Sequence, residues 1–367
     1  MRNSAAAAAL PHGLTDMMRQ ELLRAMAAPL LAWYDEHKRT LPWRGERDPY
    51  KVWVSEIMLQ QTRVAAVIPY YQRWMEALPT VAHLAAVDEE ELMKLWQGLG
   101  YYSRVRNLRK AAGVIMEQYG GRFPDTREEL LKLPGIGDYT AGAIAAIAFD
   151  RAVPAVDGNV LRVAARVANI AEDILDAKVK KKFQTWMEAA VSQVRPGEYN
   201  QALMDLGATV CLPNGEPLCE SCPLQNICEA RKLGIQSELP IRTQKAKRRV
   251  EEMTVYLLLR GDRVALRKRP DSGLLAGLWE FPNVPGGVGE DRSAKPLENW
   301  GLTPVDWKKK LTAKHIFTHV EWHMTGYLVQ VTGESPEFAW ADREELENFA
   351  VPSAFSKFLD EARSALP

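Results

Sequence analysis

All four cysteines of the chain lie within one stretch of eighteen residues, and this clustering limits what the stretch can form. They are Cys211, Cys219, Cys222 and Cys228. Disulfides staple distant loops of small secreted domains, whereas neighbouring thiols in a long chain are typical ligands of one metal centre. Structural zinc sites usually contain two Cys-x-x-Cys pairs, but the gaps of seven, two and five residues provide one. The spacing favours a [4Fe-4S] cluster, with zinc as the alternative.

Length and hydrophobic content predict two domains that lie outside a membrane. With 367 residues, of which 47% are hydrophobic, the chain can form two cores. The longest apolar run, Ala141 to Phe149, has nine residues, about half of what a membrane helix needs. The run from Ala5 to Leu10 is too short for a signal peptide. We therefore expect a protein that stays in the compartment that makes it and has no membrane partner.

The charges remove one simple argument for nucleic-acid binding. Basic and acidic residues both number 47, so the formal net charge is zero, whereas a strongly basic chain would predict such a partner. Two local basic patches remain. One comprises Arg104, Arg106, Arg109 and Lys110, and the other runs from Arg231 to Arg249. Either patch could contact DNA, or they could be a solvated helix face and a basic linker.

The apolar pattern changes once along the chain. Residues 1–15 are expected to be a disordered tail, and residues 16–230 repeat amphipathic helical segments, the first over 17–36, which predicts an all-α domain. A basic linker at 231–249 precedes a mixed domain at 250–367. Strands are expected there at 253–259, 263–267, 315–320 and 322–331, and helices at 342–349 and 354–363.

Two short motifs in the helical part could bind an anion or begin a helix. In Leu133-Pro134-Gly135-Ile136-Gly137 the glycines would expose amides at a helix start, where a phosphate is attracted without a basic side chain. A tight turn between helices is the alternative. Twenty residues later, Asp157 opens the next helical segment in Val-Asp-Gly-Asn-Val, and by itself it is a good N-cap.

These motifs, followed by the four-cysteine loop, resemble the endonuclease III branch of the helix-hairpin-helix glycosylase superfamily. Within it, 54–62 (VSEIMLQQT) and 96–104 (WQGLGYYSR) resemble MutY-type adenine DNA glycosylases, and the match covers about residues 30–230 with high specificity. The resemblance implies a multidomain chain whose all-α domain carries a [4Fe-4S] cluster at 211–228. It also implies a monomer that acts on double-stranded DNA and removes adenine opposite 8-oxoguanine, and opposite guanine, in base excision repair. The expected location is cytoplasmic and associated with a bacterial nucleoid.

Releasing an undamaged adenine requires two carboxyl groups in different states. One must be protonated to donate to the base, and the other must be ionised beside the sugar as positive charge develops. Glu56 has apolar neighbours that disfavour its anion, although a surface position is the alternative. Amides at a helix start would keep Asp157 charged. The resemblance implies that Glu56 protonates N7 of adenine, that Asp157 is the catalytic aspartate and that Asn159 orients a carboxylate or the nucleophile.

Tyr139 separates two mechanisms. Endonuclease III relatives have a lysine two positions after the second hairpin glycine, where it forms a Schiff base with the sugar and allows strand cleavage. Tyr139 occupies this position and has no amine. A monofunctional glycosylase with Tyr139 near the sugar is therefore expected, rather than a glycosylase-lyase. A metal-stabilised DNA-binding protein without catalysis is a third possibility, which Glu56 and Asp157 oppose.

The resemblance also assigns DNA-contacting residues. Adenine must leave the helix stack to reach the acid, so both a pocket and a plug are needed. Trp43, Arg44 and Gln201 match the adenine pocket, although Trp43 could be a core residue and the two polar residues could lie on the surface. Gln61, Leu99 and Tyr101 match residues that enter the duplex around the partner base, and Thr62 is expected to contact that base or its backbone. Gly135 and Gly137 are the expected phosphate-binding residues.

The segment 274–282 resembles the start of a Nudix-like C-terminal domain that reads 8-oxoguanine. Nothing between Gly286 and Gly301 supplies the glutamate-rich magnesium motif of Nudix hydrolases, so pyrophosphatase activity is not expected. Phe317, Thr318 and His319 occupy the place of a Phe-Ser-His loop, with an ordinary strand turn as the alternative. Two departures remain: Thr318 adds a methyl group, and the first cysteine gap is seven residues where the family usually has six.

Overall fold

The computed structural model describes residues 13–243, 247–289 and 293–367, in two compact units. One unit comprises Met1–Ala86 and Asn107–Gln244, and the other comprises Val87–Arg106 and Lys245–Pro367. Most of the tail expected at 1–15 lies outside the described residues, but Thr15 already caps the first helix by accepting a hydrogen bond from the Met18 amide. No helix in the described part of the chain is long and apolar enough to cross a membrane.

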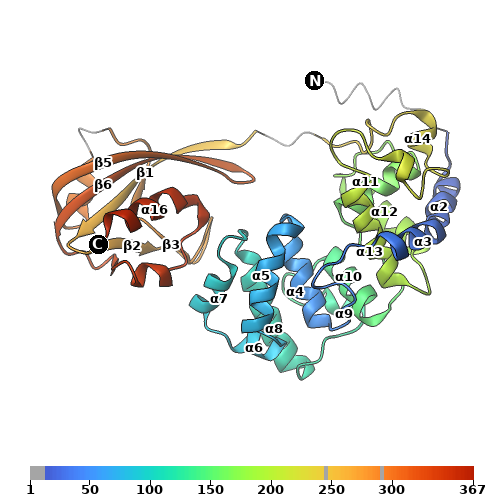
Figure 1. Ribbon diagram of the computed structural model, residues 1–367, viewed down its shortest axis with the longest axis horizontal. Helices are drawn as coiled ribbons and strands as arrows, with labels where there is room; N and C mark the ends of the chain where they lie inside the picture. Colours follow the sequence, from blue (N-terminus) through green and yellow to red (C-terminus); the bar gives the residue numbers. More distant parts are fainter. Residues whose placement is uncertain (1–12, 244–246, 290–292) are drawn as a thin grey trace. The chain divides into compact units, whose positions relative to one another are not determined.

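The described chain up to residue 243 is helical, as expected (Figure 1). The helices are α2 (Asp16–Ala25), α3 (Ala27–His37), α4 (Pro49–Leu59), α5 (Val64–Ala77), α6 (Val81–Ala86), α7 (Glu89–Trp96), α8 (Ser103–Tyr119), α9 (Arg127–Leu130), α10 (Asp138–Phe149), α11 (Gly158–Val167), α12 (Ala177–Ala190), α13 (Pro196–Thr209) and α14 (Glu229–Leu233). The prediction of one helix over 17–36 is wrong at Met26, where the amide bonds to the Leu23 carbonyl and separates α2 from α3.

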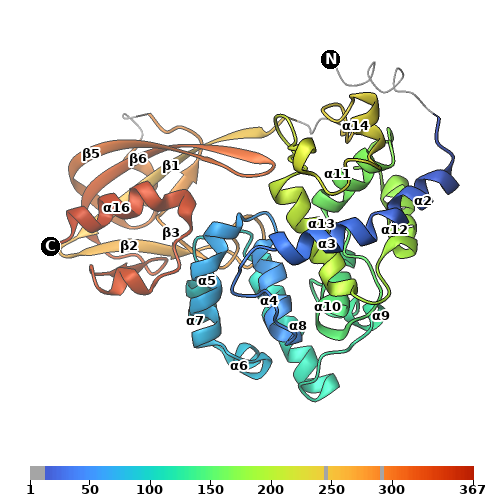
Figure 2. The same ribbon diagram turned by 45° about the vertical axis from the view of Figure 1, so that its right-hand side comes forward.

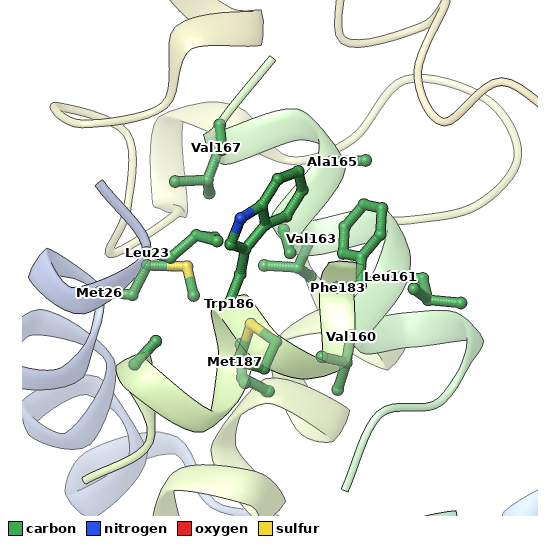
Figure 3. Packing of buried hydrophobic residues seen from close by; sticks show 14 of the residues in the cluster. Leu23, Met26, Val160, Leu161, Val163, Ala165, Val167, Phe183, Trp186 and Met187 are labelled. Carbon is green, nitrogen blue, oxygen red and sulfur yellow. The ribbon is translucent and has the colours of Figure 1, made fainter. Parts of the chain in front are cut away.

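A large apolar core joins helices that are far apart in the sequence. Figure 3 shows Trp186 and Met187 of α12 packed against Leu23 and Met26 of the N-terminal segment and against side chains of α11. Trp186 is 4% exposed, and its ring meets that of Phe183 edge-on with centroids 5.6 Å apart. Each large side chain buried here contributes about 1.5–3 kcal/mol. This core holds the N-termini of α11 and α13 in place.

Helix α10 packs so closely on its surroundings that two positions accept only glycine. A Cβ at Gly142 would lie 2.2 Å from the Pro154 carbonyl oxygen, in the segment that leads to α11. A Cβ at Gly197 of α13 would lie 2.9 Å from the Ala146 carbonyl oxygen. The small residues of α10 therefore bring the segment before α11, and α13, directly against the helix.

We expect Gly142→Ala to lower the free energy of unfolding by about 2–3 kcal/mol, because the added methyl group meets a backbone oxygen that cannot rotate away. Gly113→Ala in α8 is the matched control, since a Cβ there would meet no atom of another part of the chain within 4 Å. There the change should stabilise the helix by up to about 1 kcal/mol. Urea unfolding of both variants measures the difference, and equal effects would contradict the close approach.

The second unit is built around a seven-stranded sheet. Besides α7, its elements are β1 (Arg249–Arg260), β2 (Arg263–Lys268), β3 (Trp279–Glu280), β4 (Asn283–Pro285), α15 (Lys295–Asn299), β5 (Leu302–Ile316), β6 (Val320–Gly333), β7 (Ala339–Ala341), 3-10 helices at Glu345–Asn348 and Ser353–Phe355, and α16 (Ser356–Ala365). The order is β3-β2-β1-β6-β5, with β4 beside β1 and β7 beside β2, and β1 runs parallel to β6. The expected order of a helical part followed by a mixed part is confirmed.

Helix α16 covers one face of this sheet in both views (Figures 1 and 2). Gly326 of β6 allows the approach, because a Cβ there would lie 2.4 Å from the Phe358 ring. The predicted hairpin of 253–259 and 263–267 is confirmed, with Leu259 opposite Val264. The predicted strand at 315–320 is wrong, because β5 ends at Ile316 and β6 begins at Val320. Residues 317–319 form the turn between them, closed by a bond of 2.8 Å from the Phe317 amide to the Val320 carbonyl.

Candidate active site

Glu56 lies inside the helical unit rather than on its surface. It belongs to α4, of which seven other side chains are also buried, and it is 5% exposed. The Tyr139 hydroxyl donates a hydrogen bond of 2.5 Å to its Oε2. Burial raises the pKa of Glu56, and the nearby Asp157 carboxylate raises it further, while Tyr139 and the Arg44 cation oppose the shift. The Glu56 carboxyl group therefore stays protonated to a higher pH than an ordinary glutamate side chain does.

Asp157 is the N-cap of α11, as its sequence position predicts. Its Oδ1 accepts hydrogen bonds of 2.8 Å from the amides of Asn159 and Val160, and its Oδ2 accepts one of 2.7 Å from Asn159 Nδ2. Burial raises the pKa of Asp157, and these three hydrogen bonds oppose the rise because they stabilise the anion. The Asp157 carboxylate also raises the pKa of both Glu56 and Tyr139.

Arg162 was not singled out from the sequence, yet it holds Asn159 in place. Its Nη2 donates to Asn159 Oδ1 at 3.0 Å and to the Gly207 carbonyl at 2.6 Å. Its Nε donates to the Cys211 carbonyl at 2.8 Å. Gly207 leaves room for this arrangement, because a Cβ there would lie 2.6 Å from Asn159 Cβ. The spacing of three residues from Asn159 on one helix is the one sequence signal for Arg162.

The three predicted adenine-pocket residues occupy different environments. Trp43 is 4% exposed and its ring packs edge-on against Tyr71, with centroids 5.3 Å apart. Arg44 and Gln201 line an open cleft of about 380 Å³, together with Tyr34. Gln201 is buried and accepts a hydrogen bond of 2.7 Å from the Tyr34 hydroxyl. The structure therefore places Arg44 and Gln201 together and Trp43 in the adjoining core.

The hairpin glycines lie on the surface, before α10. Gly135 has φ of +76°, a conformation that favours glycine, and a Cβ there would meet the Asn107 side chain at 2.5 Å. Gly137 is the N-cap residue of α10. Leu133 and Ile136 are buried and anchor the turn. The helix start that the sequence predicts as a phosphate site therefore lies at the surface, and phosphate binding there stays a prediction.

The residues expected to enter the duplex lie in two turns with unusual backbone angles. Gln61, directly after α4, is exposed with φ of +57°, and the Thr62 hydroxyl donates to the Gln60 carbonyl at 3.4 Å. In the second unit, Tyr101 has φ of +48° and is 46% exposed, whereas Leu99 is buried. Non-glycine residues with positive φ often mark functional turns.

The β5–β6 turn carries the other predicted reading residues. Phe317 packs edge-on between the rings of His315 and Trp322, at centroid distances of 4.5 and 4.8 Å. Thr318 is half-buried and its hydroxyl lies 2.6 Å from the Tyr101 hydroxyl, within the same unit. His319 is exposed. Two segments that the sequence analysis selected separately, 99–101 and 317–319, thus meet through a hydrogen bond.

All four cysteines are free thiols and line one cavity beside α11. Apolar residues including Val163 and Leu224 form its wall, and Arg166 Nη1 lies 3.2 Å from Cys211 Sγ. Gly215, with φ of +73°, turns the chain within the seven-residue gap, and the Leu218 amide closes that loop on the Val210 carbonyl at 2.9 Å. Among the described residues, no group of three or more His, Cys, Asp or Glu side chains is positioned to hold a single metal ion.

Comparisons with known proteins agree with this architecture. Residues 54–189 match the HhH-GPD superfamily base excision DNA repair protein family, and residues 254–361 match the NUDIX domain. Adenine DNA glycosylase of Rattus norvegicus is 38% identical over 94% of this chain and 82% of its own length. The Homo sapiens protein of the same name is 37% identical over 91% of this chain and 73% of its own length.

Solved structures resemble the helical part. A thermostable thymine-DNA glycosylase is 27% identical, with a TM-score of 0.53, and the match covers 58% of this chain and 98% of that protein. A trapped endonuclease III–DNA covalent intermediate is 26% identical, with a TM-score of 0.50, and the match covers 61% of this chain and all of that protein. The predicted helix-hairpin-helix and Nudix-like domains are confirmed.

Proposed function

Because the chain belongs to the adenine DNA glycosylases of the helix-hairpin-helix base excision repair superfamily, we propose that its substrate is adenine opposite 8-oxoguanine, and opposite guanine, in double-stranded DNA. The observation that supports the mechanism is a pair of carboxyl groups: the buried Glu56, which accepts a hydrogen bond from Tyr139, and the half-buried Asp157 at the start of α11, which interacts electrostatically with Glu56. The monomeric state stays a prediction. The location in a bacterial cytoplasm, next to the nucleoid, also stays a prediction.

In the proposed reaction the adenine is rotated out of the stack before its bond to the sugar breaks. Glu56 donates its proton to N7, so that adenine leaves as a neutral base. Asp157 stays ionised and stabilises the positive charge that develops on the sugar as the N-glycosidic bond breaks. Water then adds to the anomeric carbon and loses a proton, which leaves an abasic site. Asn159 holds the Asp157 carboxylate through its 2.7 Å hydrogen bond.

Tyr139 supports a monofunctional enzyme. A lyase needs an amine that forms a Schiff base with the sugar, and a tyrosine hydroxyl cannot supply one. The Tyr139 hydroxyl instead donates to Glu56. A duplex containing adenine opposite 8-oxoguanine tests this: strand breaks should appear only after hot alkali. Breaks without alkali, or trapping of DNA by borohydride, would indicate a lyase, and no breaks at all would indicate a binding protein.

We assign recognition of the partner base to the second unit and the turn after α4. Hydrogen bonds to the altered edge of 8-oxoguanine distinguish it from guanine. Thr318, joined to Tyr101 through their hydroxyl groups, is the proposed reading residue, with Phe317 and His319 shaping its turn. Gln61, Thr62 and Leu99 would contact the partner base or fill the space that adenine leaves. Gly135 and Gly137 would hold a phosphate.

We propose that Cys211, Cys219, Cys222 and Cys228 hold a [4Fe-4S] cluster. Four free thiols around one cavity with an apolar wall suit a group that is shielded from water, and Arg166 beside Cys211 suits a thiolate ligand. We expect the purified protein to be brown with broad violet absorbance and to contain iron. Cys222→Ser should lose the colour, and a colourless wild type with tightly bound zinc would contradict the assignment.

Removing the Tyr139 hydroxyl should move the alkaline limit of activity upward. The hydrogen bond from Tyr139 stabilises the ionised form of Glu56 and lowers its pKa below what burial alone would produce. In Tyr139→Phe the pKa of Glu56 rises, so the protonated acid persists to a pH about one unit higher. Single-turnover base release across pH measures this limit.

Tyr119→Phe is the matched control, because Tyr119 donates a similar hydrogen bond of 3.1 Å to Glu129 in an exposed part of the helical unit. Its pH profile should equal that of the wild type. An alkaline limit that stays in place or moves downward in Tyr139→Phe would contradict the proposed role of the Tyr139–Glu56 bond.

A further inference from the structure

One fully buried carboxylate lies behind the adenine site and has no assigned role. Asp205 of α13 is 0% exposed. Its Oδ1 accepts hydrogen bonds of 2.9 and 2.6 Å from Arg39 Nε and Nη2, and its Oδ2 accepts one of 3.2 Å from the Arg39 amide. Arg44 Nη2 also donates to Oδ1. One carboxylate on α13 therefore binds two of the arginines of the segment between α3 and α4, Arg39 and Arg44.

Arg44 connects this buried carboxylate to the proposed acid. Its guanidinium lies 5.9 Å from the centre of the Tyr34 ring, and the Tyr34 hydroxyl bonds to Gln201. Among the described residues, Arg44 Nε is buried without a hydrogen-bond partner. The Arg44 side chain is 13% exposed, so solvent screens its charge only weakly.

Groups on three parts of the chain act on Glu56. Tyr139 of α10 donates to it, Asp157 at the start of α11 is the neighbouring acid, and Arg44 from the segment before α4 is the cation. An uncompensated cation close to a carboxyl group favours ionisation of that group. Asp205 of α13 carries the opposite charge in direct contact with Arg44, and it also pairs with Arg39, whose side chain is 27% exposed.

We infer that Asp205 is a positioning residue of the adenine site: it fixes Arg44 for contact with the extruded base and balances the charge of Arg44 so that Glu56 stays protonated. The inference rests on the proposed role of Glu56 as the acid. Asp205 thus orients the base-binding Arg44 and also controls the protonation of Glu56 on another helix.

The test is the pH profile of single-turnover adenine release by the full-length holoprotein. In Asp205→Asn the Arg44 cation is no longer balanced, so the alkaline limit should move down by about one pH unit. Arg44→Gln removes the cation and should move the limit upward. Asp205→Glu keeps the charge and should keep the limit of the wild type, even where the longer side chain slows release.

Asp35→Asn is the matched control, because Asp35 accepts two hydrogen bonds from Arg195 in an exposed ion pair. Its profile should equal that of the wild type. A limit in Asp205→Asn that is unmoved or moves upward, while release slows, would overturn the inference and leave Asp205 a structural residue. If Asp205→Asn does not fold, Arg44→Gln provides the test. An alkaline pH limit of Arg44→Gln that equals or lies below that of the wild type would also overturn the proposed role of Asp205.

Failure of the underlying mechanism would look different. If Glu56 is not the acid, Glu56→Gln retains activity and the wild-type profile does not depend on that residue. If Glu56 is the acid and Asp205 has no influence on it, Glu56→Gln is inactive while Asp205→Asn and the wild type share one alkaline limit. These two outcomes distinguish failure of the Asp205 role from failure of the acid role of Glu56.

Discussion

Glu56→Gln is expected to slow adenine release at least about 1,000-fold while leaving binding to the mismatched duplex nearly unchanged. Glutamine has the same shape and can accept the hydrogen bond from Tyr139, but it has no proton to give to N7. A factor of 1,000 corresponds to about 4 kcal/mol of transition-state stabilisation, which lies in the range for a general acid. Single-turnover release from a duplex with adenine opposite 8-oxoguanine measures the rate, and a gel-shift assay measures binding.

Glu129→Gln is the control for this substitution, because Glu129 also accepts a hydrogen bond from a tyrosine, Tyr119, but lies in an exposed part of the same unit. It should release adenine at the wild-type rate. A rate of adenine release by Glu56→Gln within tenfold of the wild-type rate would contradict the proposed role of Glu56 as the acid.

Asp157→Asn is expected to reduce adenine release by about 1,000-fold or more without unfolding α11. Asparagine is as good an N-cap as aspartate, so the amides of Asn159 and Val160 keep an acceptor. The negative charge beside the developing cation is lost, and with it the main electrostatic stabilisation of the transition state. Thermal unfolding should change little, whereas single-turnover release should nearly disappear.

Asp176→Asn separates charge loss from cap loss. Asp176 caps α12 with the same pattern, accepting hydrogen bonds from the amides of Lys178 and Val179, and it lies outside the active site. Its substitution should leave the rate unchanged. If both variants released adenine at similar rates, Asp157 would be an N-cap and nothing more.

Local chemistry explains which residues could be predicted from the sequence. Asp157 was recognised as an N-cap because its interactions lie within three residues of it along the chain. Gly135 was recognised because a tight turn demands a backbone angle that glycine adopts easily. The strand expected at 315–320 failed because 317–319 have the apolar and β-branched residues of a strand while the chain reverses there.

Asp205 and Arg162 could not be singled out, because their roles depend on partners distant in the sequence. Asp205 meets Arg39, 166 positions away, and Arg162 meets the Cys211 carbonyl, 49 positions away. A buried ion pair has no local signature, since either side chain alone resembles an ordinary surface charge on an amphipathic helix.

The sequence by itself determined the local parts of this protein: the cap at Asp157, the glycine turn before α10 and the four thiols in one short loop. These depend on backbone angles and on neighbours a few residues away. Only the tertiary structure decided that Tyr139 bonds to Glu56, that Asp157 interacts electrostatically with Glu56 and that Asp205 binds Arg44. Packing of α10 through Gly142 brings these segments together, and removal of the carboxyl groups from water, which no single segment can achieve, raises the pKa values of Glu56 and Asp157.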